Sequence, residues 1–214
     1  RLTTTDHVSA GTEITVRPPY LAHLTPSTLV VLCMFDGGVK GQGKKDREPI
    51  AGGGVALWVL HGLHAPERYL ELPLPYPNLT TNNEAEGMSA LIGLKQAGSC
   101  MRMILAQPRF RHLQKSIRLG GDSAIILGGL RGAFRTRAPS LVHIVAETRL
   151  EEALLAWPVA FFHVPRELNV EADHLVHQAQ QLVVWRKKHT EGSLRPLPRT
   201  PVSPKWLDDG PADP

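Results

Sequence analysis

The sequence lacks several features that would assign it quickly to a class of protein. No run of 18 or more apolar residues occurs in its 214 residues, so we expect no transmembrane helix and no membrane role. Only two cysteines are present, which argues against a disulfide scaffold and fits an intracellular protein, nuclear or cytoplasmic. Cys33 lies in an apolar run and is expected to be a buried free thiol. No convincing Ser-His-Asp or Cys-His arrangement is found.

The composition is that of an ordinary globular protein, with 42% hydrophobic and 21% charged residues. We expect an irregular leader or linker over 1–27, one domain over 28–185, and a Pro-rich basic tail over 186–214 that we expect to be disordered. The chain begins at Arg1 without a basic-then-apolar leader, so we expect no signal peptide. One interpretation of a chain that begins at Arg1 is that it is a fragment of a longer polyprotein.

The charge is unevenly distributed along the chain. The formal net charge is +4, and the stretch from Arg102 to Arg137 holds eight Lys or Arg against one acidic residue, Asp122. Such a stretch is a candidate footprint for a polyanion, although a solvated basic face explains the charge equally well.

Apolar runs and turn residues predict alternating strands and helices. We expect strands at 29–35, 51–60, 68–74, 116–121 and 158–164, with helices at 82–97, 123–130, 140–156 and 169–184. Gly37 and Gly38 are expected to end the first strand, and 101–114 is weakly defined. Short early connections and later crossover helices predict an α/β fold, a mixed five-stranded sheet with helices on both faces.

Two glutamates lie near the start of the helix expected at 82–97. Either Thr81 caps with Glu84 or Asn83 caps with Glu86. Residues two apart point to different sides of a helix, so the two glutamates cannot share a face. Glu86 continues a stripe of small residues that suits close packing on the sheet. We therefore favour Thr81 with Glu84 as the capping box and Glu86 as an inward carboxylate, the alternative being that Glu86 only caps.

Three aspartates occupy corresponding places elsewhere in the predicted fold. Asp36 follows the first strand, Asp122 follows the fourth strand, and Asp173 lies one turn into the last helix. Each has an ordinary structural explanation in turns, capping or surface charge. Together with Glu86 they could converge, and four such oxygen donors suit Mg²⁺ or Mn²⁺ better than zinc. His174 and His177 are read as solvated, and His163 as structural.

These residues belong to four segments that resemble the motifs of type-one ribonuclease H. The segments occur in the family's order: Phe35-Asp36-Gly37-Gly38, Thr80-Thr81-Asn82-Asn83-Glu84-Ala85-Glu86, Gly121-Asp122-Ser123, and the last motif from His163 to Leu175. The last motif is most similar to the plant and retroelement version, with its HVPRE-N-AD-L pattern. The resemblance covers about 29–182 and implies a ribonuclease H-like fold whose first three strands are antiparallel.

The resemblance also implies roles for individual residues. Asp36, Glu86, Asp122 and Asp173 match the catalytic carboxylates that bind two metal ions. Asn82 and Asn83 match asparagines that contact the RNA/DNA hybrid, Thr81 a position near a DNA phosphate, and Gly37 and Gly38 the segment that approaches RNA 2′-hydroxyls. From the basic stretch, we expect Arg131, Arg135 and Arg137 to hold phosphates.

The leading expectation is a Mg²⁺-dependent endonuclease that cuts RNA in RNA/DNA hybrids, with Mn²⁺ as an alternative cofactor and a reverse-transcribing element as a candidate origin. Two departures from the family's pattern bear on this expectation. The loop Pro165-Arg166-Glu167-Leu168 lacks the histidine of bacterial-type members, as the retroelement version also does, and 101–114 is unusually long.

The alternatives are a non-catalytic module that binds nucleic acid or a partner, and a 3′-to-5′ exonuclease. Exonucleases of this broad fold usually carry Asp-x-Glu where this chain has Asp36-Gly37-Gly38.

Overall fold

The computed structural model describes residues 21–43 and 48–188. The expected leader up to residue 20 and the expected tail from residue 189 lie outside the described residues, so their predictions stay untested. The main elements are, in chain order, β1 (Thr28–Lys40), β2 (Ile50–His61), β3 (Glu67–Tyr76), α1 (Asn82–Leu105), β4 (Gln114–Gly121), α2 (Ala124–Leu130), α3 (Pro139–Leu154), β5 (Val159–His163) and α4 (Val170–Lys188).

The five strands form one mixed sheet in the order β3-β2-β1-β4-β5. β1 pairs antiparallel with β2, and β2 pairs antiparallel with β3. β4 pairs parallel with both β1 and β5. The mixed five-stranded sheet with antiparallel early strands and parallel later strands was predicted and is confirmed, whereas the order of the strands was not predicted.

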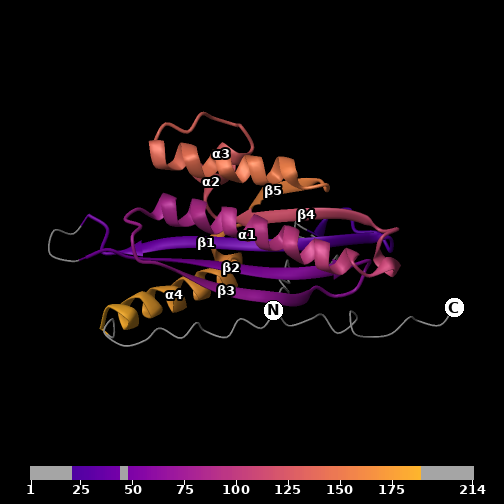
Figure 1. Cartoon of the computed structure of the whole chain (residues 1–214), viewed down its shortest axis with the longest axis horizontal. Coiled ribbons are helices and arrows are strands. Elements are labelled where there is room, and N and C mark those ends of the chain that lie inside the picture. Colours follow the sequence, from indigo (N-terminus) through magenta and orange to yellow (C-terminus); the bar gives the residue numbers. More distant parts are fainter. Residues whose placement is uncertain (1–20, 44–47, 189–214) are drawn as a thin grey trace, which may run out of the picture.

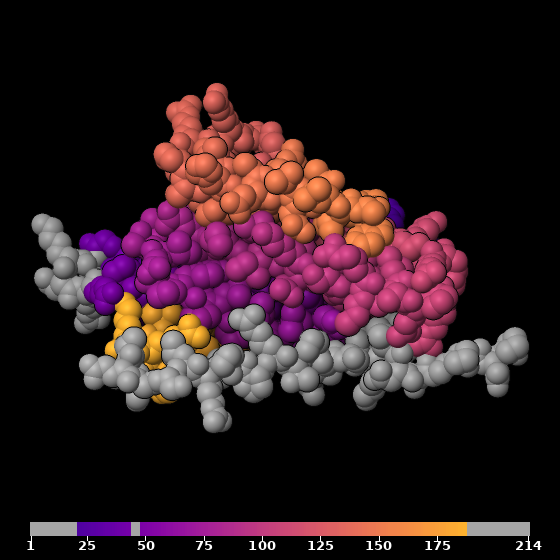
Figure 2. Space-filling view, in the orientation of Figure 1, coloured from indigo at the N-terminus to yellow at the C-terminus, as the bar shows by residue number. Residues whose placement is uncertain are grey.

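Helices cover both faces of the sheet (Figure 1). Side chains of β1 alternate between the faces: Val31, Cys33 and Phe35 pack in the core beneath α1, whereas Val30, Leu32 and Met34 pack in a smaller core beneath α4. α2 and α3 lie outside α1 and contribute to the larger core. Figure 2 shows the segment from α2 to β5 as the raised part of the surface above α1. By the same alternation, Asp36 belongs to the α4 face.

The first strand does not end at Gly37-Gly38, as the sequence reading expected. β1 runs on to Lys40, and its pairing with β2 continues through Gly37↔Gly53 to Lys40↔Ile50. Glycine is needed there for contact with a helix rather than for a turn. A Cβ on Gly37 would lie 2.2 Å from the backbone of Ala85 and Glu86, so the first turn of α1 rests directly on the strand.

Two helices are longer than expected. α1 continues to Leu105, eight residues past the predicted end, because Cys100, Met101 and Ile104 extend its buried face. The segment 101–114, expected to be weakly defined, is therefore helix, a short 3₁₀ turn at Pro108–Phe110 and the first residue of β4. α4 likewise extends to Lys188.

Both cysteines are buried and free, as Cys33 was predicted to be. Among the described residues, none of the helices combines the length and the apolar character that a bilayer crossing requires.

Candidate metal centre

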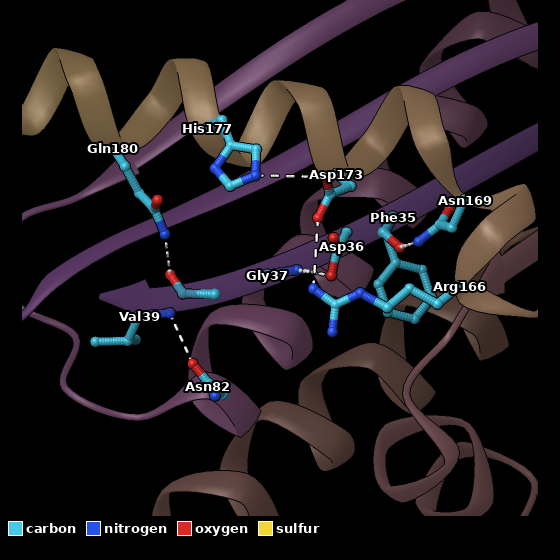
Figure 3. A network of polar contacts seen from close by, with 11 residues as sticks. Phe35, Asp36, Gly37, Val39, Asn82, Arg166, Asn169, Asp173, His177 and Gln180 are labelled. Carbon is cyan, nitrogen blue, oxygen red and sulfur yellow. Dashed lines mark hydrogen bonds and ion pairs between the residues drawn. The ribbon is translucent and has the colours of Figure 1, made fainter. Parts of the chain in front are cut away.

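The site lies where β1 and β4 part. Their pairing ends at Met34↔Gly120, and β1 continues for six more residues. Side chains then bond to the backbone of β1: the Asn169 amide nitrogen donates to the Phe35 carbonyl at 2.9 Å, and the Val39 N–H donates to the Asn82 amide oxygen at 2.7 Å. The Phe35 carbonyl is buried and therefore needs such a partner. Side chains thus replace the missing strand partner of β1 at this opening (Figure 3).

Three carboxylates converge at this opening. Asp36 comes from β1, Glu86 from the second turn of α1, and Asp122 from the residue that follows β4. Each offers an oxygen atom, and these atoms lie within 4.8 Å of one another. Asp36 is 7% exposed, and the other two are half-buried. The convergence predicted for these three residues is thus present in the fold.

The environment raises the pKa of two of these carboxyl groups, Asp36 and Glu86. Burial, followed by the negative charge of Asp122, raises the pKa of Asp36 to about 7, although the Gly37 N–H that donates to its carboxylate opposes the shift. Burial also raises the pKa of Glu86, against the lowering effect of a hydrogen bond with Ser123. Carboxylates in such a setting are stabilised in their charged form by a bound cation.

Asp173 lies beside the cluster but outside the group of three. It stands in the first turn of α4, and its negative charge contributes to the raised pKa of Asp36. One of its oxygens is 3.7 Å from the Arg166 guanidinium, and the other is 3.5 Å from the His177 ring nitrogen (Figure 3). The fourth predicted carboxylate is therefore near the site and paired with neighbours from its own segment.

The two glutamates of α1 have the separate positions that the helix geometry predicted. Thr81 is the N-cap of α1, and its hydroxyl accepts from the Glu84 N–H at 3.3 Å. Hydrogen bonds with Ser140, with the Thr81 side chain and with the backbone of the cap lower the pKa of Glu84. Glu84 is thus the capping glutamate, and Glu86 is the one directed into the site.

The residues expected to contact a hybrid flank this opening. Asn82 is exposed at the start of α1, and its backbone N–H also donates to the Gln42 side chain at 3.2 Å. Asn83 is half-buried next to it. The carbonyl of Gly38 accepts from the amide nitrogen of Gln180 at 3.0 Å. Asn82 thus has a structural bond to β1 that the sequence reading did not foresee.

The basic stretch divides into two groups. Arg102 lies in the last turn of α1, about 24 Å from Glu86 at the usual helical rise over 16 residues. Beyond it, Arg111 donates to the carbonyls of Leu105 and Ala106 and so caps the end of that helix. The second group is the exposed segment after α2, where Arg131 donates to the Phe161 carbonyl at 2.9 and 3.1 Å. This second group, which also holds Arg135 and Arg137, follows the C-terminal end of α2, whereas Asp122 precedes the N-terminal end of that helix.

Sequence reasoning missed the positions of several polar residues around the site. Asn169 is 1% exposed and its amide oxygen has no hydrogen-bond partner among the described residues. An Asn before a helix signals a cap, and the Asn169 carbonyl does accept from the Asp173 N–H, but nothing local signals its bond to β1. Of the histidines, His163 lies 3.2 Å from the Asp122 carbonyl, in agreement with a structural role, and His174 and His177 are exposed.

Comparison with solved structures identifies the fold. Ribonuclease H1 from the halophilic archaeon Halobacterium salinarum is 23% identical, with a TM-score of 0.52 over 71% of this chain and 98% of its own. The N-terminal ribonuclease H domain of a Mycobacterium tuberculosis protein is 20% identical, with a TM-score of 0.53 over 75% and 99%. The prototype foamy virus ribonuclease H domain is 14% identical, with a TM-score of 0.51 over 72% and 96%. The chain therefore has the ribonuclease H fold that the motif resemblance implied.

At the level of sequence alone, no protein-family model matches the chain, and a search of curated proteins found no match.

Proposed function

We propose that the chain is a metal-dependent endonuclease that hydrolyses the RNA strand of RNA/DNA hybrids. The observation that carries the proposal is the convergence of Asp36, Glu86 and Asp122 at the opening between β1 and β4 of a ribonuclease H fold. A cluster of acids that is buried or half-buried destabilises a protein unless a cation compensates its negative charge. An origin in the polyprotein of a reverse-transcribing element accords with the likeness to the foamy virus domain.

The donor set fits hard divalent cations. All the converging atoms are carboxylate oxygens, which suit Mg²⁺ or Mn²⁺, and a bound cation would offset the burial and the neighbouring negative charges that raise the pKa of Asp36. Asp36, Glu86 and Asp122 would hold the cations, with Asp173 as the fourth ligand. A pair of divalent cations, when bound, supplies an activated water and neutralises charge on the leaving 3′-oxygen.

The chain's own residues would position the substrate. The strand segment Gly37-Gly38 and the amides of Asn82 and Asn83 border the opening, where they can contact 2′-hydroxyls, the group that distinguishes RNA from DNA. The Asn82 amide oxygen already accepts from Val39, so its amide nitrogen is the atom that can donate to a nucleic acid. Thr81 would lie near a phosphate of the DNA strand. Arg131, Arg135 and Arg137 would add phosphate contacts that weaken as salt rises.

The test is cleavage of a labelled hybrid duplex that carries an internal RNA stretch, in Mg²⁺, in Mn²⁺ and in chelator. The two glutamates of α1 supply a matched pair of variants, because Glu86→Gln and Glu84→Gln make the same chemical change two residues apart. We expect Glu86→Gln and Asp122→Asn to lower the rate by roughly 100-fold or more, the scale of losing a group that acts on transition-state charge. Glu84→Gln should cut at close to the wild-type rate.

Each other outcome selects a different function. Cuts that start from a 3′ end would indicate the exonuclease. Tight hybrid binding without cuts in either metal would indicate the non-catalytic binding module. Equal losses in Glu84→Gln and Glu86→Gln, with both variants folded by circular dichroism, would contradict the assignment of Glu86 to the reaction.

A further inference from the structure

The fourth carboxylate of the site, Asp173, is not a member of the group that the other three form. The oxygens of Asp36, Glu86 and Asp122 lie within 4.8 Å of one another, and Asp173 is not a member of that group. Its oxygens instead face two nitrogen-bearing side chains of its own segment, Arg166 at 3.7 Å and His177 at 3.5 Å. The site thus contains a group of three carboxylates and a fourth carboxylate that is paired with the Arg166 guanidinium.

The backbone of Arg166 is fixed while its side chain extends into solvent. Arg166 begins the 3₁₀ turn Arg166–Leu168, in which the Leu168 N–H donates to Pro165 and the Asn169 N–H donates to Arg166. Its side chain is 77% exposed. An ion pair this exposed contributes little to the free energy of unfolding, so a contribution to stability does not explain why Arg166 is paired with Asp173.

The guanidinium acts on more than one acid of the site. Besides its contact with Asp173, its positive charge favours the charged form of Glu86 and opposes the burial that raises the pKa of that residue. Because an arginine stays protonated at any working pH, this charge cannot be switched off by proton loss. Any divalent cation that approaches Asp173 therefore meets a competitor of the same sign (Figure 3).

We propose that Arg166 is a positioning residue that competes with the second divalent cation for Asp173. The guanidinium is paired with Asp173, and this pair must break before that carboxylate becomes a ligand. Asp36, Glu86 and Asp122 would then hold a cation with higher affinity than the position that needs Asp173, because no arginine pair has to break at the group of three. This inference rests on the proposed function, since it concerns the same cations.

The test is a Mn²⁺ titration of the full chain without nucleic acid, in which electron paramagnetic resonance measures free Mn²⁺. We expect two binding steps in the wild type. Arg166→Gln removes the competing charge, so its weaker step should tighten by roughly twofold to tenfold while the tighter step stays unchanged. Arg166→Lys keeps the charge and should stay within about twofold of the wild type.

Two controls separate this effect from a general change of charge. Arg102→Gln makes the same substitution at the far end of α1 and should leave both steps unchanged. In an Asp173→Asn background, Arg166→Gln should have no further effect on the weaker step, because the carboxylate for which Arg166 competes is gone.

The outcomes are independent of the cleavage assay. Unchanged or weaker Mn²⁺ binding in Arg166→Gln, a single binding step in the wild type, or an equal response to Arg102→Gln would each overturn the inference, even if the protein cuts hybrids. Tighter binding in Arg166→Gln alone would support it, even if no hybrid is cut and the proposed function fails.

Discussion

The backbone of β1 has different hydrogen-bond partners at the two ends of its pairing with β4. At the end where both strands begin, backbone groups of neighbouring segments pair with one another: the Gln114 N–H donates to the Ser27 carbonyl at 2.8 Å, and the N–H of Gly62, after β2, donates to the Thr28 carbonyl at 2.8 Å. The Thr28 hydroxyl adds local hydrogen bonds to the backbone of Thr25. At the site end, Asn169, Asp36 and Asn82 take the place of a strand partner. Backbone bonds can form with many sequences, whereas side-chain bonds depend on particular residues. The site end is therefore the part of the sheet that the sequence must specify residue by residue.

The largest expected effect comes from the contact between β1 and α1 at the site. Gly37→Ala would place a Cβ 2.2 Å from the backbone of Ala85 and Glu86, so the first turn of the helix must shift. We expect a loss of about 3 kcal/mol in the free energy of unfolding. Gly38→Ala is the matched control, because its Cβ would meet only side-chain atoms at 3.5 and 3.6 Å. Urea unfolding of both variants measures the difference, and equal losses would refute the close contact.

The second effect concerns the charge stored at the site. Burial raises the pKa of Asp36 in the folded protein to about 7, from an ordinary value of 3.8. Because the folded protein binds the Asp36 proton more tightly than the unfolded chain does, the protonated form adds to the free energy of unfolding. This contribution is complete below pH 4 and is lost as the pH rises through 7. Relative to Asp36→Asn, the metal-free wild type should therefore lose about 2 kcal/mol of unfolding free energy between pH 5 and pH 8. Mg²⁺ at pH 8 should restore stability in the wild type only.

Denaturant unfolding at both pH values, with chelator and with Mg²⁺, tests this prediction. If the unfolding free energies of the wild type and Asp36→Asn differ by the same amount at pH 5 and at pH 8, the charged form of Asp36 does not destabilise the fold. A Mg²⁺ response of equal size in both proteins would place the stabilising ion elsewhere.

The smallest effect concerns the amide that holds the open backbone of β1. Asn169→Ala removes the bond to the Phe35 carbonyl and leaves a buried acceptor without a partner. We expect a loss of about 1 to 2 kcal/mol of unfolding free energy. Gln178→Ala, on the exposed side of the helix that follows Asn169, should change stability much less. Hydrogen exchange of the residues after Phe35 would show whether the loss is local to the site, and unaltered exchange there would argue against this role.

Much of the fold could be predicted because its signals are local. Apolar periodicity located every strand, and the two-residue offset between Glu84 and Glu86 separated the capping residue from the inward one. The failures involve contacts between distant segments. Gly37 was read as a strand end because nothing near it in the sequence reveals that α1 lies on it, and the bond between Asn169 and Phe35 joins residues 134 positions apart.

In the candidate site, too, features with local signals could be predicted and contacts between distant segments could not. The convergence of Asp36, Glu86 and Asp122 followed from the order of the elements, since strand ends and a helix start meet at one edge of the sheet. Their roles, and those of Asp173 and the residues expected to contact nucleic acid, stay predictions. The position of Arg166 could not be predicted, because a 3₁₀ turn orients its side chain and its partner lies on the following helix.

The pairing of β1 with β4 also governs when the site can form as the chain folds. β1, β2 and β3 form consecutive hairpins, which close quickly because their partners are near in sequence. The first β1–β4 partners, Thr28 and Gln114, are separated by 114 − 28 = 86 residues, and such long loops close late. Asp36 belongs to the early hairpins and Asp122 to the end of the late strand. No folding intermediate that lacks β4 can assemble the three carboxylates, so a growing chain acquires the complete cluster only after most of the domain has been synthesised.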